Sequence, residues 1–217
     1  GTVITDTSTG ASYTSTGASA LYDVSTWNLK TLTVTPFKDS TASFDITVKA
    51  TAKESSTGVE AVTTGKVSIV VTAVNDAPTL DLSIADGSVA TGFSASYTER
   101  GTNGVAITGN VAIGDVDSSQ MQSATITLKN ASSGDVLSSN LVAGGGTYKR
   151  VTVTSVGTDV SGKIVLTLSG VADTATYKAL LESFQYSNTG KYPSLGDRTI
   201  DISVMDNEGS NSLSSSV

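Results

Sequence analysis

Oxygen-bearing side chains that could ligate a hard cation gather around one short segment, Asn75-Asp76-Ala77-Pro78. The proline of this segment cannot donate to a sheet ladder, and it biases the residue before it toward an extended conformation, so the segment is typical of a stiff linker between two β-rich regions. Other acids along the chain could converge on this junction, and carboxylate and amide oxygens in such number suit Ca²⁺. The candidate ligands are Asp39, Asn75, Asp76, Glu99, Asp115, Asp117 and Asp206.

The residue types of the chain disfavour catalysis. Because it contains no histidine and no cysteine, it lacks the usual nucleophilic triads, reactive thiolates and zinc ligands. Paired carboxylates could hydrolyse glycosides, but these acids are expected at strand ends beside the linker, which is the pattern of ion sites. We therefore expect a protein that is not an enzyme.

The net charge of the chain disfavours some classes of binding partner. The 217 residues carry a formal net charge of -7. Such a surface repels nucleic-acid phosphates and anionic lipids, and no run approaches the apolar length of a membrane span, so we expect neither nucleic-acid binding nor membrane insertion. The lack of cysteine leaves the compartment open, because a secreted protein can replace disulfides with metal and a cytosolic protein needs none.

Alternation of apolar and polar residues recurs along the chain and predicts an all-β fold. It is clear at residues 31–36, 44–50, 67–74, 124–128, 164–168 and 200–204. Period two with one polar face is typical of antiparallel sheets that are solvated on one side, and short strands separated by turn clusters indicate β-sandwiches. Only residues 174–184 show helix-like spacing, which predicts one or two helical turns with Thr174 as the N-cap.

The linker divides the chain into two expected modules, residues 1–76 and residues 77–217. A complete sandwich of the immunoglobulin type takes about 100 residues. The first module is therefore expected to be N-terminally incomplete, with about five strands and two missing.

Two features of the sequence together resemble cadherin-type modules. The stretch Val74-Asn75-Asp76-Ala77-Pro78 is similar to the cadherin linker that ends in Asn-Asp-Asn-Ala-Pro, and the acids follow it in the cadherin order. Asp115-Val116-Asp117 stands where cadherins carry Asp-x-Asp before a strand, and Asp206 stands where they carry Ala-x-Asp. Segments such as Leu166-Thr167-Leu168-Ser169-Gly170-Val171-Ala172-Asp173 further resemble the tandem cadherin-like repeats of giant bacterial surface adhesins, many of them RTX-type.

This resemblance implies two tandem Greek-key β-sandwich modules that bind Ca²⁺. It implies a location on the bacterial cell surface, and a function in adhesion and biofilm formation as an extender that rigidifies a fibre carrying a binding domain. The implied partners are neighbouring modules of the same adhesin and a surface glycan or protein ligand. The linker lacks one acid of the cadherin version and the Leu-Asp-Arg-Glu signature is missing, with Asp39 and Asp197-Arg198 as stand-ins, so fewer ions are implied.

Two other functions stay open at this stage. The chain could be a carbohydrate- or peptide-binding module, since Trp27 and seven tyrosines could stack on sugars, although a lone tryptophan is more often a core residue. It could also be a subunit that completes its fold with a strand from a neighbour. The sequence further predicts that Asp173 caps the helix, that Asp135 is a turn residue away from the linker, and that Lys149-Arg150 protects a strand edge.

Overall fold

A computed structural model describes residues 1–17, 20–87, 92–100, 103–142, 145–158, 162–212 and 215–216. The chain forms an all-β protein that divides into two compact units, Gly1–Val74 and Asn75–Val217. The sequence placed the boundary two residues later, after Asp76. The assignment of these units to cadherin-like modules stays a prediction.

The first unit contains two separate antiparallel sheets. One has the strand order β2-β1-β3, and the other is a hairpin of β4 and β5. A 3₁₀ turn, η1, leads into β3. The elements are β1 (Val3–Asp6), β2 (Ser12–Thr14), η1 (Leu29–Thr31), β3 (Leu32–Thr35), β4 (Phe44–Lys53) and β5 (Glu60–Ile69).

The hairpin of β4 and β5 is long and amphipathic. Ten residue pairs join its strands, from Phe44 opposite Ile69 to Lys53 opposite Glu60. Because side chains alternate between faces, Phe44 and Ile46 share one face with their partners Ile69 and Val67, while Asp45 lies on the other face and pairs with Lys66 at 2.8 Å. The alternation predicted for this region is confirmed.

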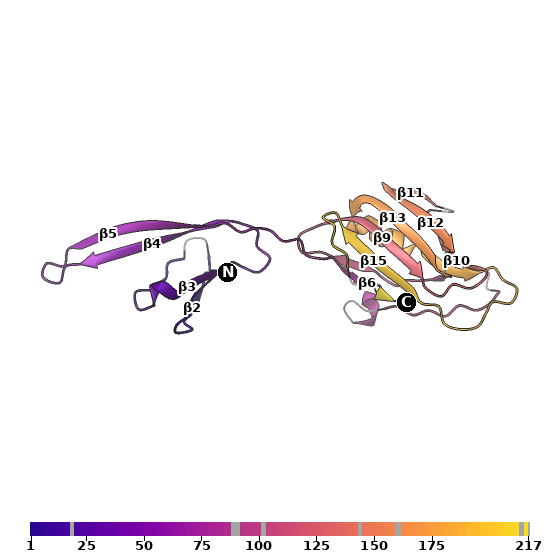
Figure 1. Cartoon of the computed structure of the whole chain (residues 1–217), viewed down its shortest axis with the longest axis horizontal. Helices are drawn as coiled ribbons and strands as arrows, with labels where there is room; N and C mark the ends of the chain where they lie inside the picture. Colours follow the sequence, from indigo (N-terminus) through magenta and orange to yellow (C-terminus); the bar gives the residue numbers. More distant parts are fainter. Residues whose placement is uncertain are drawn as a thin grey trace. The chain divides into compact units, whose positions relative to one another are not determined.

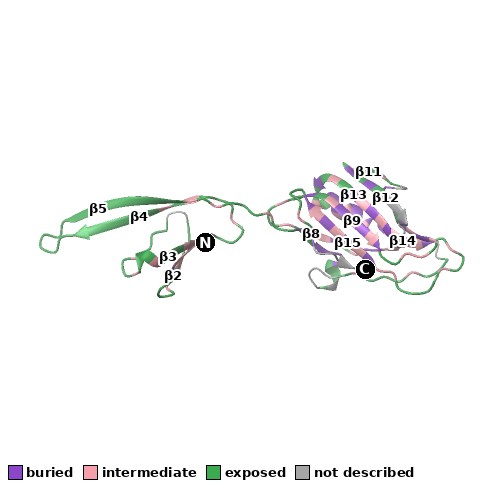
Figure 2. Ribbon diagram, in the orientation of Figure 1, coloured by how far each residue is buried: buried purple, intermediate pink, exposed green. Residues whose placement is uncertain are grey.

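The described residues of the first unit bury almost nothing. The hairpin of β4 and β5, called the β4–β5 ribbon below, is exposed along nearly its whole length in Figure 2, and Val48 on its apolar face is 49% exposed. The buried residue among the described part of this unit is an aspartate, Asp6, at the end of β1. The described strands of this unit therefore do not enclose a hydrophobic core between them.

The second unit is sandwich-like. Its largest sheet has six strands in the order β11-β12-β13-β9-β15-β16, and a smaller sheet has the order β10-β14-β7 (Figure 1). A two-stranded sheet pairs β6 with β8, and a 3₁₀ turn, η2, follows β6. The elements are β6 (Thr79–Asp81), η2 (Ile84–Asp86), β7 (Val105–Ala106), β8 (Ala112–Gly114), β9 (Gln120–Leu128), β10 (Asp135–Ser139), β11 (Gly146–Tyr148), β12 (Val151–Thr158), β13 (Ile164–Asp173), α1 (Thr174–Glu182), β14 (Phe184–Asn188), β15 (Ile200–Asp206) and β16 (Ser215–Ser216).

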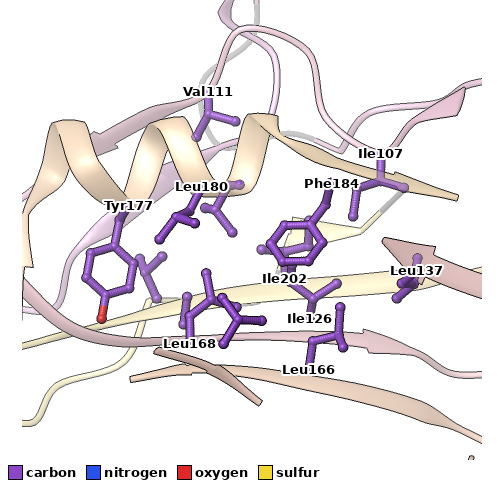
Figure 3. Packing of buried hydrophobic residues seen from close by; sticks show 14 of the residues in the cluster. Ile107, Val111, Ile126, Leu137, Leu166, Leu168, Tyr177, Leu180, Phe184 and Ile202 are labelled. Atoms are coloured by element: carbon purple, nitrogen blue, oxygen red, sulfur yellow. The ribbon is translucent and has the colours of Figure 1, made fainter. Parts of the chain in front are cut away.

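The core of this unit follows directly from strand alternation. Along β9, the alternating positions Ala124, Ile126 and Leu128 are each exposed by 1% or less, and Met121 is also fully buried, out of phase with them because the register shifts between residues 121 and 123. Figure 3 shows side chains from the large sheet, from α1 and from β14 meeting in one cluster. Full burial of an aliphatic or aromatic side chain stabilises a fold by about 1.5–3 kcal/mol, so this cluster holds the second unit together without help from the first.

The helix α1 lies where its spacing predicted it. Of the two caps expected from the sequence, Asp173 is confirmed and Thr174 is wrong: Asp173 is the N-cap, and its carboxylate accepts a hydrogen bond of 2.7 Å from the backbone N–H of Thr176. Leu180 is fully buried, and Figure 3 shows it pointing from α1 into the core cluster. At nine residues α1 is short, and no helix in the described part of the chain has the length and apolar character that a bilayer crossing requires.

Candidate functional site

Strand pairing brings the sequence-predicted acids of the second unit together. Because β6 pairs antiparallel with β8, and Thr79 lies opposite Gly114, the residues just before β6 lie beside those just after β8. These residues are Asn75 and Asp76 on one side and Asp115 and Asp117 on the other. The end of β15 is opposite the start of β9, with Asp206 paired to Met121, which places Asp206 at the same end of the fold.

Hydrogen bonds tie these residues into one cluster. The side-chain amide of Asn75 donates to Oδ2 of Asp206 at 2.9 Å and to Oγ of Ser210 at 2.7 Å. The backbone N–H of Asp76 donates to Oδ2 of Asp117 at 2.9 Å. We call Asn75, Asp76, Asp115, Asp117 and Asp206 the junction cluster.

Asp206 is the buried anchor of the junction cluster. Its side chain is fully buried, and its Oδ1 accepts hydrogen bonds from the backbone N–H groups of Glu208, Gly209 and Ser210 at 2.6–2.9 Å. Burial raises the pKa of Asp206, but the hydrogen bonds from Ser210, Asn75 and the other donors outweigh it and hold the pKa below its ordinary value. Asp206 is therefore a carboxylate at neutral pH, and it organises the turn that follows β15.

Asp115 and Asp117 are close neighbours that influence each other's ionisation. Oδ1 of Asp115 accepts from the backbone N–H groups of Asp117 and Ser118, each at 3.0 Å. Burial, together with the neighbouring Asp117 carboxyl, raises the pKa of Asp115. The hydrogen bond from the Asp76 N–H, followed by the neighbouring Asp115 carboxyl group, lowers the pKa of Asp117, against the opposing charge of Asp206. Three carboxyl groups are therefore close enough to influence one another.

Two oxygens of the junction cluster have no hydrogen-bond partner among the residues that the structure describes. They are Oδ1 of Asn75 and Oδ2 of Asp115, and both are buried. A buried acceptor without a partner costs about 1–3 kcal/mol, so such atoms call for an explanation such as an ion or a water. The donor chemistry fits Ca²⁺, which prefers carboxylate and amide oxygens. Within the described ranges, however, the structure assembles no group of three or more acidic, histidine or cysteine side chains that could hold a metal as it stands.

Two of the predicted ligands lie elsewhere. Asp39 belongs to the first unit, adopts a positive φ of 60° and pairs with its neighbour Lys38 at 3.2 Å. Glu99 lines a cleft beside Ile200, the first residue of β15. Because β15 has seven residues and a strand rises about 3.3 Å per residue, that end lies roughly 20 Å from Asp206. Within the second unit, the structure therefore does not bring Glu99 into the junction cluster, and the assignment of Asp39 as a ligand stays a prediction.

A second polar cluster was missed at the sequence level. Asp135, expected to be a simple turn residue, has a fully buried side chain, and Nε of Arg198 donates to its Oδ2 at 2.6 Å. Its Oδ1 accepts from the Tyr186 hydroxyl and from the Asn188 side-chain amide, both at 2.6 Å. Burial, followed by the bond to Asp135, raises the pKa of Tyr186 to about 12. No local sequence signal pairs these residues, because 63 positions separate Asp135 from Arg198.

The expectation that Lys149-Arg150 lies along a strand edge is wrong. These two residues form the turn between β11 and β12, since Tyr148 pairs with Val151. Both have positive φ, 49° for Lys149 and 93° for Arg150, as two-residue hairpin turns of the primed type require. Their charges therefore stand at a hairpin tip rather than along an edge.

The lone tryptophan lies in an aromatic group of the first unit. The rings of Tyr13 and Tyr22 stack with centroids 4.1 Å apart, and Trp27 lies 5.4 Å from Tyr22 at a tilt of 60°. Trp27 is of intermediate exposure rather than a core residue. We assign this group no ligand.

The chain was compared with protein-family models, with curated proteins and with solved structures, and none of the three comparisons finds a match. The resemblance to cadherin-like adhesin repeats therefore rests on the sequence motifs alone.

Proposed function

We propose that this chain is a Ca²⁺-stabilised extender module of an extracellular bacterial adhesin. The observation that supports the proposal is the pair of buried oxygens without partners, Oδ1 of Asn75 and Oδ2 of Asp115, within a cluster of three carboxyl groups. Ca²⁺ sites of extracellular modules commonly have dissociation constants of about 10⁻⁴–10⁻³ M, and we expect a value in this range.

The proposed role depends on where the junction cluster lies in the chain. Asn75 and Asp76 are the first two residues of the second unit and directly follow Val74 of the first. Bound Ca²⁺ would supply positive charge to Asp115, Asp117 and Asp206; at present Asp117 raises the pKa of Asp115, and the charge of Asp206 opposes the ionisation of Asp117. Bound Ca²⁺ would reinforce the hydrogen bonds that already hold Asn75 and Asp76 to the second unit, and the proposed result is a linker with less freedom and a stiffer fibre.

The uncovered apolar face of the first unit supports the proposal that the chain is part of a longer fibre. Its described strands leave an apolar ribbon face uncovered, as a module does when its remaining strands come from elsewhere in the assembly. Neighbouring modules of the same adhesin are the proposed partners, and the bacterial cell surface is the proposed location.

The test is a calcium titration of the whole chain. Isothermal titration should give a dissociation constant in the sub-millimolar to millimolar range, and small-angle scattering should show a longer and narrower distance distribution in Ca²⁺ than in EGTA. Equal melting temperatures and equal scattering profiles in Ca²⁺ and in EGTA, at matched ionic strength, would contradict the proposal.

A further inference from the structure

An open cleft lies on the side of the second unit away from the junction cluster. Its volume is about 600 Å³, within the range of ligand-binding pockets. One wall is residues 94–99 and the other is the loop 193–199. The floor is formed by Ile107, Tyr186 and Ile200, which also belong to the hydrophobic core or its buried edge.

The free edge of the three-stranded sheet faces this cleft. β7 is the last strand of the order β10-β14-β7, and Ala106 lines the cleft. The N–H of Ile107 donates to the carbonyl of Phe184 at 3.3 Å, so residues 107 and 184 form a hydrogen-bonded pair of the ladder. Hydrogen-bonded and non-bonded pairs alternate along an antiparallel ladder, so Ala106, opposite Gln185, points its N–H and C=O away from β14.

These outward groups of Ala106 find no backbone partner in the part of the chain that the structure describes. The nearby residues 94–99 form no strand, and among the described residues a side chain of this segment bonds to the body of the unit, from the Tyr97 hydroxyl to the carbonyl of Asn188 at 3.3 Å. A sheet edge with unpaired backbone groups at a cleft is the arrangement that accepts an added strand.

One wall of the cleft, the loop 193–199, is held in place by hydrogen bonds to the rest of the second unit. Arg198 anchors the loop 193–199 to the buried Asp135, and its other nitrogens donate to the carbonyls of Gly196 and Ser194. Asn130 clamps the same loop from outside, donating to the Asp197 carbonyl and accepting from the Thr199 N–H, both at 2.9 Å. A preformed site loses less conformational entropy on binding.

The charges at the rim of the cleft indicate the charge that a ligand should carry. The carboxylates of Glu99 and Asp197 lie at the cleft, and neither has a salt bridge to a described residue. Arg198 is the cationic residue of the lining, and its guanidinium is already paired with Asp135 and only 13% exposed. The cleft therefore presents negative charge above an apolar floor.

We propose that this cleft binds an extended peptide strand that pairs with the β7 edge at Ala106. The peptide would place an apolar side chain on the floor and a lysine or arginine against Glu99 and Asp197. This inference does not depend on Ca²⁺ or on the extender function.

The experiment uses the whole chain as bait for a library of random twelve-residue peptides displayed on phage, in Ca²⁺ and in EGTA. Enriched peptides should alternate apolar and basic residues. Synthetic copies should shift the amide resonances of Ala106 and Tyr97 and bind more weakly as salt rises, because the rim contact is electrostatic.

Two variants separate edge pairing from adhesion to the surface. Ala106→Pro removes the outward N–H, and proline is tolerated on edge strands at such positions, so the variant should fold and lose at least tenfold in affinity. Glu99→Lys/Asp197→Lys should lose a similar factor, whereas Glu54→Lys, an exposed charge reversal in the first unit, should bind as the parent does.

Three outcomes would overturn the proposal: no enriched peptide, binding that survives Ala106→Pro, or binding that is indifferent to the rim charges. A parallel glycan array covers the competing ligand class. Glycan binding that Ala106→Pro leaves unchanged would assign the cleft to a sugar instead.

Discussion

Asn75 and Asp206 are joined by a hydrogen bond of 2.9 Å although 131 positions separate them in the chain. The bond fixes the first residue of the second unit to the last residue of β15. Because Asp206 also accepts three backbone N–H bonds from its own turn, a disturbance at Asn75 reaches the end of the large sheet directly.

The first prediction isolates calcium binding from folding. Asp117 is exposed, so Asp117→Asn should leave the melting temperature in EGTA nearly unchanged. It should reduce the stabilisation by Ca²⁺, which for the parent chain is about 2.7 kcal/mol at a hundredfold excess over the dissociation constant. Differential scanning calorimetry in both conditions measures the two effects.

The control for that experiment must be chosen with care. Asp135→Ala is unsuitable because Asp135 is buried and paired, so its loss would destabilise the fold by itself. Glu208→Gln changes an exposed carboxyl in the turn after β15 and should keep the full calcium response. If Asp117→Asn responds to Ca²⁺ as strongly as Glu208→Gln does, Asp117 is not a ligand.

The second prediction concerns the buried pair of Arg198 and Asp135. Arg198→Met should lower the free energy of unfolding by about 3–5 kcal/mol, because it leaves a buried carboxylate without its cation. The double variant Arg198→Met/Asp135→Asn should recover part of this loss, since the buried charge is gone. Urea unfolding, followed by far-ultraviolet circular dichroism, measures the free energy of unfolding of the parent chain and of both variants. Equal values for all three would show that the ion pair contributes little.

The sequence predicts the parts of this fold that depend on local periodicity. The alternation at residues 44–50 and 124–128 places β4 and β9 correctly, and the order of acids around the linker places Asn75 near Asp206. The sequence does not predict contacts between buried residues that are distant along the chain. Asp135 and Arg198 each lie among polar turn residues, and no local pattern indicates that both side chains point inward. The prediction also fails at Lys149-Arg150, where two residues disfavoured at positive φ occupy a turn.

The third prediction follows from a close backbone approach. Gly170 lies in β13 at φ +139°, and a Cβ there would meet the carbonyl oxygen of Arg150 at 2.2 Å. Gly170→Ala should therefore destabilise the second unit by about 2–4 kcal/mol, from backbone strain and overlap together. Gly146→Ala is the matched change, because its Cβ would meet nothing within 4 Å, and thermal melts of the two variants should differ by many degrees.

The fourth prediction is a stabilising change. Asparagine and glycine adopt positive φ more readily than lysine and arginine do, so Lys149→Asn/Arg150→Gly should raise the free energy of unfolding by about 1 kcal/mol. A rise in the urea midpoint at constant slope is the expected result. A lower midpoint would mean that the two cations make compensating contacts, for example between Lys149 and the Tyr148 ring, whose centroid is 5.4 Å away.

The fifth prediction concerns acid and the first unit. Asp6 accepts hydrogen bonds from Thr31, Ser8, Thr9 and the Asn28 N–H, and the bonds from Thr31 and Ser8 do most to hold its pKa well below the ordinary value. A carboxyl with a lowered pKa stabilises the fold fully above its unfolded pKa of about 3.9 and loses this effect as the pH falls further.

Amide exchange reports on this unit separately from the second. Protection of the Ser8 and Asn28 amides should fall as the pH drops below about 4, after correction for intrinsic exchange. Asp6→Asn should show low protection at every pH. A parent chain whose protection at these two amides is flat with pH would mean that Asp6 does not organise the unit.

The β4–β5 ribbon has a mechanical consequence for any protein that works under tension. The chain enters the hairpin at Phe44 and leaves it at Ile69, which face each other at the same end. A pull on the two ends of the chain therefore loads one pair at a time and unzips the ribbon, instead of shearing all ten pairs together. Opening the hairpin would release roughly 85–95 Å of chain length, at ~3.3–3.6 Å per residue. The first unit would therefore lengthen at low force while the core of the second unit stays folded.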